Sequence, residues 1–512
     1  MQKTSFLADK KNIKFSIFWI SIFLFVVVLL SLYDLTAPPI SPTIWRQTQT
    51  AMLTENFARE GFNLNGLYVN LRGNQKLMMI YEFPIYNFVV GVFFLIFNAS
   101  AVFWGKLVSL ISVLVSFFYL FKLTREVYGK SVAVYASLFF LFAPIRLLLT
   151  TAVQPDALGV MLMLMGLSSL LNWKRKKLLK DLSLFCFFLL LAGWTKFPII
   201  VPYILIIGSA ILFDKGRVRF PETLEIVVYI GIFLVPFTAW YLFRGYISCP
   251  EAMSDKINMF LIGDLTRFLS PEYYVKPFFV LGALVFCASG ILFFLAGLKK
   301  LSAVGWALVG GIPFYFILVP TVRNQYYYLY PLVPIFSVIM ARGFLIFRNY
   351  CDNRKLKQLF YGSIAVFVIG FIISGTYVLR HDKVTYYAAN ALKKNSLPTD
   401  LVFSLNMHDR GQGVGGENPA MMYLANRKGW NATQGSDYFE DILRQTREIQ
   451  AVGAKWMVVT WYTFDLEPWF AYVLPLNLRR KPSVEGKQIF EKLKDYYPVV
   501  EEKNNYAIMK LG

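Results

Sequence analysis

Carboxylates, cations and aromatic residues gather in residues 34–86, which separate the first long apolar run of the chain from the next. The stretch contains Arg46 and Gln47 in the string WRQTQT, and Glu82 and Tyr86 in the string YEFPIYNF. Ordering a long loop costs backbone entropy of roughly 1–2 kcal/mol per residue. Because long ordered loops often carry function, we predict a functional site here rather than an ordinary solvated loop.

Two further charged residues stand at the ends of apolar runs. Asp156, in TTAVQPDALGV, follows a proline and directly precedes an apolar run, which fits either a helix cap or a site carboxylate. Lys196, in GWTKFP, lies between two apolar runs. Its ammonium either extends to the membrane interface or anchors a lipid phosphate.

Arg323 adds a forked donor suited to phosphate, in the string VRNQYYYLYPLVP. Tyr326 and the two tyrosines after it fit the same site or an aromatic belt at the membrane surface. Grouped on one membrane face, these cations and carboxylates predict a site for a membrane lipid that carries phosphate.

Histidine chemistry is excluded from the apolar part of the chain, because the two histidines, His381 and His408, both lie near or within the C-terminal segment. General-base chemistry therefore falls to carboxylates of the outer loops, which are Asp34, Glu55, Glu60, Glu82, Asp156 and those within residues 244–276. The four cysteines show no spacing typical of a metal site or a disulfide framework. The sequence predicts no cofactor, and a divalent metal ion is possible but not indicated.

Composition assigns these residues to a membrane protein. Of the 512 residues, 56% are hydrophobic and 16% are charged, whereas soluble domains carry about 25% charged residues. The mean hydropathy is +0.50. The net charge of +21 comes mostly from basic residues in short loops beside apolar runs. This pattern sets membrane topology and does not indicate nucleic-acid binding.

Basic loops such as KRKK at residues 174–177 fix the predicted orientation. They all lie inside only if the short apolar run 88–97 is a re-entrant or juxtamembrane helix. The first run lacks a cleavage site and is predicted to be a retained anchor. We predict eleven spans, with the N-terminus inside and the C-terminus outside, at residues 15–32, 102–123, 131–151, 158–171, 182–194, 198–213, 226–243, 277–298, 304–319, 332–347 and 360–379.

The composition changes after residue 380. The apolar runs LVFSL and KWMVVTW have strand length, and residues 437–453 have helical apolar spacing. We predict a membrane domain over residues 1–380 and an extracytoplasmic α/β domain over residues 381–512. The string GQGVGG at residues 411–416 lacks the lysine and hydroxyl residue of a phosphate loop, so we interpret it as a flexible loop.

The order of these motifs resembles that of the GT-C membrane glycosyltransferases, including the dolichyl-phosphate-mannose protein mannosyltransferases and the lipid A aminoarabinose transferases. The resemblance covers most of residues 15–379 and rests on the large first outer loop and five strings: WRQTQT, YEFPIYNF, QPDALGVMLML, GWTKFPIIVP and RNQYYYLYPLVPIF. WRQTQT is similar to a signature of one bacterial branch. Residues 381–512 match no family that we name.

The resemblance implies an α-helical polytopic fold and transfer of a sugar from a polyprenyl-phosphate donor to a lipid, glycan or protein acceptor. It implies the outer face of a bacterial inner membrane as the place of reaction. Lys196, Arg323 and Tyr326 would bind the donor phosphate, and a carboxylate would take the acceptor proton. A single in-line displacement would invert the anomeric carbon.

The chain departs from the family at the usual catalytic acid, because Arg46 and Gln47 stand at that place and Gln49 stands where the bacterial branch often has Asp. We therefore assign the base to Glu82, beside the proline-aromatic segment, and the second site carboxylate to Asp156. We predict that Arg46, Gln47 and Tyr86 contribute to substrate binding. Two alternatives stay open: a transporter or flippase for a lipid-linked sugar, which would commonly show internal repeats, and a non-catalytic partner subunit of a glycosylation complex.

Overall fold

The computed structural model describes residues 22–512 apart from 23, 26–27, 30, 41–42, 215–216, 219, 248–270, 300, 320–321, 323–324, 352, 380–382, 409–417, 433–438 and 463–483. The chain forms two compact units. The first comprises Met1–Thr36, Tyr81–Tyr86 and Lys106–Val378, and the second comprises Ala37–Ile80, Asn87–Gly105 and Leu379–Gly512. The predicted boundary at residue 380 divided the chain differently, since it placed all of residues 34–86 with the membrane helices.

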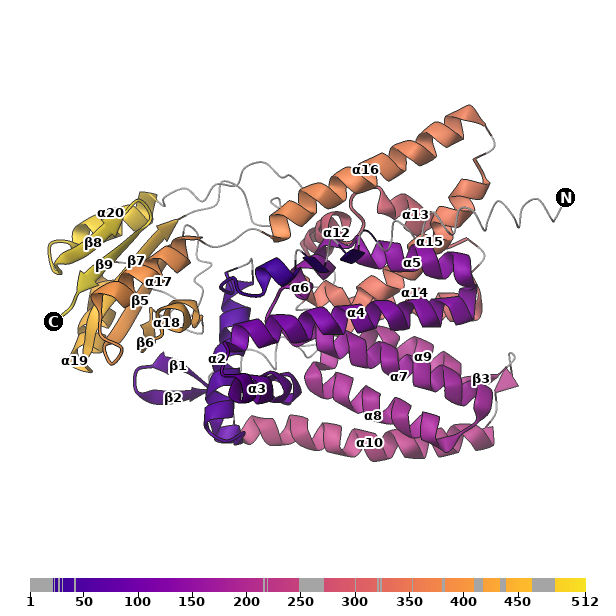
Figure 1. Ribbon diagram of the computed structural model, residues 1–512, viewed down its shortest axis with the longest axis horizontal. Helices are drawn as coiled ribbons and strands as arrows, with labels where there is room; N and C mark the ends of the chain where they lie inside the picture. The colour runs from indigo at the N-terminus through magenta and orange to yellow at the C-terminus, as the bar shows by residue number, and fades with distance from the viewer. Residues whose placement is uncertain are drawn as a thin grey trace. The chain divides into compact units, whose positions relative to one another are not determined.

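The first unit is built of helices (Figure 1). They are α4 (Ala101–Tyr128, which begins in the second unit), α5 (Lys130–Leu141), α6 (Pro144–Thr150), α7 (Asp156–Lys176), α8 (Leu179–Thr195), α9 (Ile204–Leu212), α10 (Phe220–Ile247), α12 (Pro271–Leu284), α13 (Gly290–Gly297), α14 (Ala303–Leu318), α15 (Val333–Asn349) and α16 (Arg354–Val378). Short 3₁₀ helices join several of them: η2 (Phe197–Ile199), η3 (Val201–Tyr203) and η6 (Tyr326–Leu332).

Several of these helices match the predicted membrane spans. Within the described residues, five are long and apolar enough to cross a membrane: Ala101–Tyr128, Asp156–Lys176, Val227–Arg244, Tyr326–Asn349 and Arg354–Thr376. The pair α5 and α6, bent by 66°, adds a sixth if it is one span. The multi-span helical class is confirmed. The count of eleven stays a prediction, and the span 15–32 lies mostly outside the described residues.

The predicted span at residues 277–298 is not one continuous helix. Residues 277–298 break between α12 and α13, where Cys287 and Ala288 have left-handed backbones with φ of 46° and 64°. The break brings this backbone against α16, because a side-chain carbon at Gly370 would lie 2.5 Å from the Cys287 carbonyl oxygen. The Ser289 hydroxyl donates to the Ser363 carbonyl at 2.6 Å. These contacts offset the cost of left-handed conformation, about 1–2 kcal/mol per residue.

Close packing of α7, α8 and α10 positions the charged residues that the sequence singled out. Figure 1 shows α8 lying between α7 and α10, and both neighbours contact it. Gly193 of α8 leaves space that the Phe237 ring of α10 fills, since a side-chain carbon there would lie 2.8 Å from that ring. Small residues allow such close approach in membrane bundles. The start of α7 and the end of α8 thereby lie side by side.

The second unit contains the predicted α/β structure. Its mixed five-stranded sheet has the order β6–β5–β7–β9–β8. Strand β5 (Leu401–His408) pairs in parallel with β6 (Lys428–Asn431) and β7 (Ala454–Tyr462), whereas β9 (Tyr506–Lys510) pairs antiparallel with β7 and β8 (Val499–Lys503). The helices of this region are α17 (Lys383–Asn395), α18 (Ala420–Ala425), α19 (Phe439–Ala451) and α20 (Val484–Leu493). The GQGVGG string lies outside the described residues.

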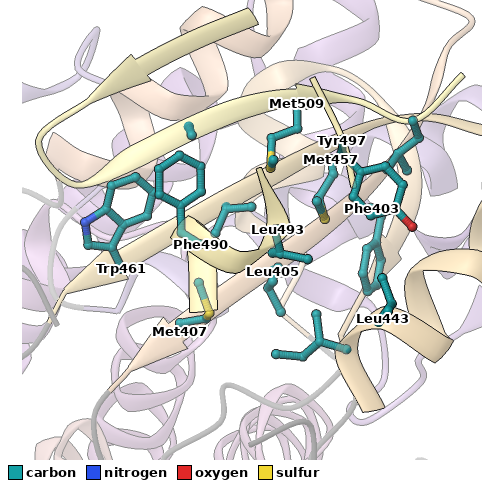
Figure 2. Close-up of a cluster of buried hydrophobic side chains, with 14 of the residues drawn as sticks. Phe403, Leu405, Met407, Leu443, Met457, Trp461, Phe490, Leu493, Tyr497 and Met509 are labelled. Atoms are coloured by element: carbon teal, nitrogen blue, oxygen red, sulfur yellow. The ribbon is translucent and has the colours of Figure 1, made fainter. Parts of the chain in front are cut away.

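Alternation along the strands creates the core of this sheet. Figure 2 shows Phe403, Leu405 and Met407 of β5 facing the same cluster as Met457 and Trp461 of β7. Period-two alternation puts such residues on one face of a strand. Helices α19 and α20 cover this face with Ile442, Leu443, Phe490 and Leu493.

The polar loop of residues 34–86 is also folded. It contains α2 (Ile44–Arg59), η1 (Leu64–Gly66) and an antiparallel hairpin of β1 (Tyr68–Arg72) and β2 (Gln75–Met78), followed by α3 (Ile85–Phe97). The hairpin contacts β6, where the Gly73 amide donates to the Gly429 carbonyl at 2.9 Å. The 13-residue α3 coincides with the short helix predicted at residues 88–97.

Gly73→Ala should destabilise the second unit by about 2–4 kcal/mol. Gly73 has φ of +59°, and a side-chain carbon there would overlap the Trp430 ring. Thermal unfolding and amide hydrogen exchange of β6 in the full chain would measure the effect.

Gly61→Ala is the matched control for this substitution. Gly61 has φ of +69° but no neighbouring atom within 4 Å of an added carbon, so only the backbone cost of about 1–2 kcal/mol applies. Equal losses in the two variants would show that contact with Trp430 contributes nothing.

Candidate functional site

The segment Tyr81–Tyr86 is held against α8 and α10 within the first unit. The Phe83 amide donates to the Trp194 carbonyl at 3.0 Å, and the two rings stack with centroids 4.3 Å apart. The Trp240 ring packs edge-on against Phe83 at 4.7 Å. The YEFP string thus forms this turn because an aromatic side chain anchors it and a proline follows.

Glu82 lies in this turn, half-buried, beside a cationic and aromatic pair from α10. The Arg244 guanidinium donates to the Tyr81 carbonyl and lies 4.3 Å from the centroid of the Tyr241 ring. The Glu82 carboxylate interacts electrostatically with Tyr241. The predicted base is therefore positioned by backbone anchors on both sides.

Asp156 and Lys196 form a buried ion pair. The Lys196 ammonium lies 2.8 Å from Asp156 Oδ1, and the side chains are 3% and 1% exposed. Lys196 sits directly after α8, where Pro198 helps to end the helix, and Asp156 is the first residue of α7. The interfacial alternative for Lys196 is wrong because the ammonium is buried. Asp156 is not a simple cap, since its carboxylate binds this ammonium.

Two tyrosine rings complete a cage around the ammonium. Lys196 Nζ lies 4.5 Å from the centroid of the Tyr327 ring and 4.0 Å from that of Tyr328. Cation–π contact stabilises a desolvated ammonium by about 2 kcal/mol. Tyr326 is half-buried and packs edge-on against Tyr327 with centroids 6.3 Å apart. The tyrosines that face Lys196 are thus the two after Tyr326, and Arg323 lies outside the described residues.

Polar atoms without a hydrogen-bond partner surround this pair. Among the described residues they include Asp156 Oδ2, both amide atoms of Gln154 and the Tyr330 hydroxyl. Gln154 is 1% exposed and Tyr330 is fully buried. Each such buried group costs about 1–3 kcal/mol. A cluster of them marks a place that binds a polar ligand.

Tyr86 connects the turn of Glu82 with this polar cluster. It is 2% exposed, and its hydroxyl shares a hydrogen bond of 3.4 Å with Ser109 Oγ. The Ser109 hydroxyl donates to the Ala152 carbonyl at 2.7 Å, and Asp156 interacts electrostatically with the Tyr86 phenol. Tyr86, Asp156 and Lys196 are thus brought together.

Arg146 is a buried cation that sequence reasoning missed. Arg146 of α6 is fully buried, and its guanidinium donates to the Leu141 carbonyl at the bend between α5 and α6. It interacts electrostatically with Tyr330, which lies in η6 with the tyrosines of the cage. A lone arginine within the apolar string APIRLLLT was the available signal.

Arg46 and Gln47 belong to α2 in the second unit and are 6% and 0% exposed. Arg46 donates to Gln49 Oε1 at 2.8 Å, and Gln47 Nε2 donates to the Thr43 hydroxyl at 3.2 Å. Gln49 in turn donates to Met79 Sδ at 3.3 Å. The residues of WRQTQT therefore form a buried polar face on α2, and their predicted role in substrate binding stays a prediction.

The buried position of Glu55, on the same helix, predicts that local stability depends on pH. Tyr423 of α18 donates to Glu55 Oε1 at 2.8 Å. Burial raises the pKa of Glu55 above its usual 4.5, against the lowering effects of Tyr423 and Arg59. Stability from this carboxyl is therefore present below pH 4.5 and is lost as the pH rises through the folded pKa. Glu55→Gln should remove this loss, measured as hydrogen exchange of α18 against pH.

Glu60 contributes to stability with the opposite pH dependence. The Lys76 ammonium donates to it at 2.8 Å and lowers the pKa of Glu60. Its contribution is thus present above the unfolded pKa and is lost as the pH falls through the folded one. If Glu55→Gln and Glu60→Gln changed the pH profile of α18 in the same direction, the interpretation of Glu55 would be wrong.

No group of three His, Cys, Asp or Glu side chains suited to a metal ion occurs among the described residues. The described site instead joins cations, carboxylates and aromatic rings. Cations of this kind pair with phosphate, and carboxylates accept protons from hydroxyl groups.

A family model matches part of the chain. Residues 82–242 match the family model described as dolichyl-phosphate-mannose-protein mannosyltransferase. The matched region contains Glu82, Asp156 and Lys196. No curated protein sequence matches the chain significantly.

Solved structures confirm the expected GT-C fold. ArnT from Cupriavidus metallidurans, bound to undecaprenyl phosphate, has a TM-score of 0.60 and 12% identity, with 96% of this chain and 98% of that one covered. The oligosaccharyltransferase AglB from Archaeoglobus fulgidus, in complex with an inhibitory peptide and a dolichol-phosphate, has a TM-score of 0.55 and 12% identity, with 96% and 80% covered. The chain is a multi-pass membrane protein with this fold, and at these identities the likeness shows the fold alone.

Proposed function

We propose that this chain is a membrane glycosyltransferase that moves a sugar from a polyprenyl-phosphate donor to a lipid, glycan or protein acceptor. The observation that carries the proposal is the buried Lys196 ammonium, held by Asp156 and two tyrosine rings beside unpartnered polar atoms. The family match over residues 82–242 supports it. A buried cation with polar neighbours suits a phosphate drawn out of water.

In this proposal the donor phosphate is the leaving group. It needs cationic stabilisation as charge develops, which the buried Lys196 ammonium beside Asp156 supplies. Glu82 accepts the acceptor proton, and Arg244 keeps its turn in place through the Tyr81 carbonyl. One in-line displacement then inverts the anomeric carbon.

A transfer assay in lipid vesicles tests the function directly. The full chain would be supplied with a series of polyprenyl-phosphate sugars, and release of polyprenyl phosphate would be measured with and without membrane extract as acceptor. Turnover is the expected result. If the chain binds polyprenyl phosphate but transfers no sugar from any donor, the partner-subunit alternative replaces the proposal. Movement of the intact donor across the vesicle would support the flippase alternative.

We further propose that the C-terminal α/β region lies on the outer face of a bacterial inner membrane. The basic loop around Lys174–Lys177 supports an inside position for the end of α7. Reporter fusions after Lys176 and at the C-terminus should report opposite sides, and the same side for both would contradict this topology.

A further inference from the structure

A cavity lies between membrane helices of the first unit and is lined by α4, α7, α9, α14 and α15. Its volume is about 160 Å³, and most of its lining is leucine, isoleucine and valine. An apolar cavity of about 150 Å³ holds one benzene molecule, so this one accommodates a chain segment of about six carbons.

Tyr203 and the start of the α7 lining at Leu164 mark the side of the cavity that is nearer to the Lys196 cage. Tyr203, 1% exposed, lines it and donates its hydroxyl to the Pro331 carbonyl at 2.7 Å. Pro331 belongs to η6, the segment that carries Tyr327 and Tyr328. Next to Tyr203, α14 approaches so closely at Gly311 that a side-chain carbon would overlap the Pro202 carbonyl. The cavity is therefore separate from the site of Asp156 and Lys196.

The other end of the cavity is polar. Thr124, 3% exposed, and Tyr128 line it, and neither hydroxyl has a hydrogen-bond partner among the described residues. A threonine hydroxyl within a helix commonly donates to the carbonyl four residues before it. The unpartnered Thr124 hydroxyl is thus available to a ligand, at a cost of about 1–3 kcal/mol when none is bound.

This polar end is also basic. Lys174 lines the cavity, and the Arg342 guanidinium lies 5.0 Å from the centroid of the Tyr128 ring. Glu126, one turn from Tyr128's end of α4, forms an ion pair with Arg175 at 3.1 Å. Lys174 and Arg342 place positive charge beside the Thr124 and Tyr128 hydroxyls, next to the apolar lining.

We infer that this cavity is a binding site for an anionic phospholipid of the bilayer, distinct from the polyprenyl-phosphate site. The phosphate lies at the rim with Lys174, Tyr128 and Arg342, and part of one acyl chain fills the cavity. Charge complementarity selects the anionic headgroup, as in other basic pockets between membrane helices. Tyr203, held by its hydrogen bond to Pro331, lies between the cavity and the segment that carries the Lys196 cage, which favours a separate ligand over a prenyl chain that continues from the cage.

Native mass spectrometry of the full chain in detergent would test this site. Phosphatidylglycerol, phosphatidylcholine with the same acyl chains, and polyprenyl phosphate would each be titrated. We expect wild type to bind phosphatidylglycerol about tenfold or more tightly than phosphatidylcholine, as for one charge-assisted hydrogen bond. The double substitution Lys174→Gln and Tyr128→Phe should remove this preference.

Ala210→Leu, which fills the cavity from α9, provides an independent test. It should weaken phosphatidylglycerol binding about tenfold and leave polyprenyl-phosphate binding unchanged, which also shows that the variant is folded. Equal binding of the two phospholipids by wild type, or unchanged phosphatidylglycerol binding in both variants, would overturn the inference. So would weaker polyprenyl-phosphate binding in Ala210→Leu, since the cavity would then belong to the donor site.

Discussion

Lys196→Met should lower the free energy of unfolding by about 3–5 kcal/mol and abolish binding of polyprenyl phosphate. The substitution leaves Asp156 as a buried carboxylate without its cation, since the two side chains are 3% and 1% exposed and 2.8 Å apart. Thermal and denaturant unfolding in detergent would measure the first effect, and lipid titration would measure the second. Lys180→Met is the matched control, because Lys180 is an exposed residue of α8, the helix that Lys196 follows, and should change stability by no more than about 0.5 kcal/mol.

A double variant separates the structural role of Lys196 from its role in binding. Lys196→Met with Asp156→Leu removes both charges, and such apolar replacements of buried pairs are often neutral or stabilising. We expect stability to return while donor binding stays lost. If the double variant bound polyprenyl phosphate as tightly as wild type, the pair would be structural only.

Asp156 and Lys196 were identifiable from sequence because each is a lone charge beside a proline between apolar runs. Their contact was not, since 40 residues separate them and it depends on how α7 packs against α8. Tyr327 and Tyr328, rather than Tyr326, face Lys196 because of the orientation of η6 about its axis. Three consecutive tyrosines in a sequence do not reveal that orientation. Gln154 was not predicted as a site residue because the candidates were recognised by their charge, and Gln154 is uncharged.

The fold shows the same division between local and non-local information. Apolar runs predicted most helices, and period-two alternation predicted β5 and β7, because these signals are local. The break between α12 and α13 depends on contacts of Ser289 and Cys287 with α16 and the turn at Phe142. The place of β9 between β7 and β8 likewise depends on chain topology rather than on any local pattern.

Glu82→Gln should lower turnover about 10²–10⁴-fold while the affinity for the donor stays unchanged. The amide keeps the size of the carboxylate but cannot accept a proton, and the anchors of its turn, Phe83 on Trp194 and Arg244 on Tyr81, do not involve the Glu82 side chain. Single-turnover kinetics and donor titration would separate the two quantities. A base with a carboxyl group also makes turnover of wild type fall at acidic pH, and this limb of the profile should be absent in the variant.

Two comparisons decide whether Glu82 is the base. Glu60→Gln changes an exposed carboxylate within residues 34–86 that accepts hydrogen bonds from Lys76 and Tyr68, and it should leave turnover unchanged. Asp156→Asn removes the charge that holds Lys196, so we expect weaker donor binding along with slower turnover. If Glu82→Gln stayed fully active and Asp156→Asn lost turnover without loss of donor affinity, the base would be Asp156. Its unpartnered Oδ2, in the cage of Lys196, would then be the atom that accepts the proton.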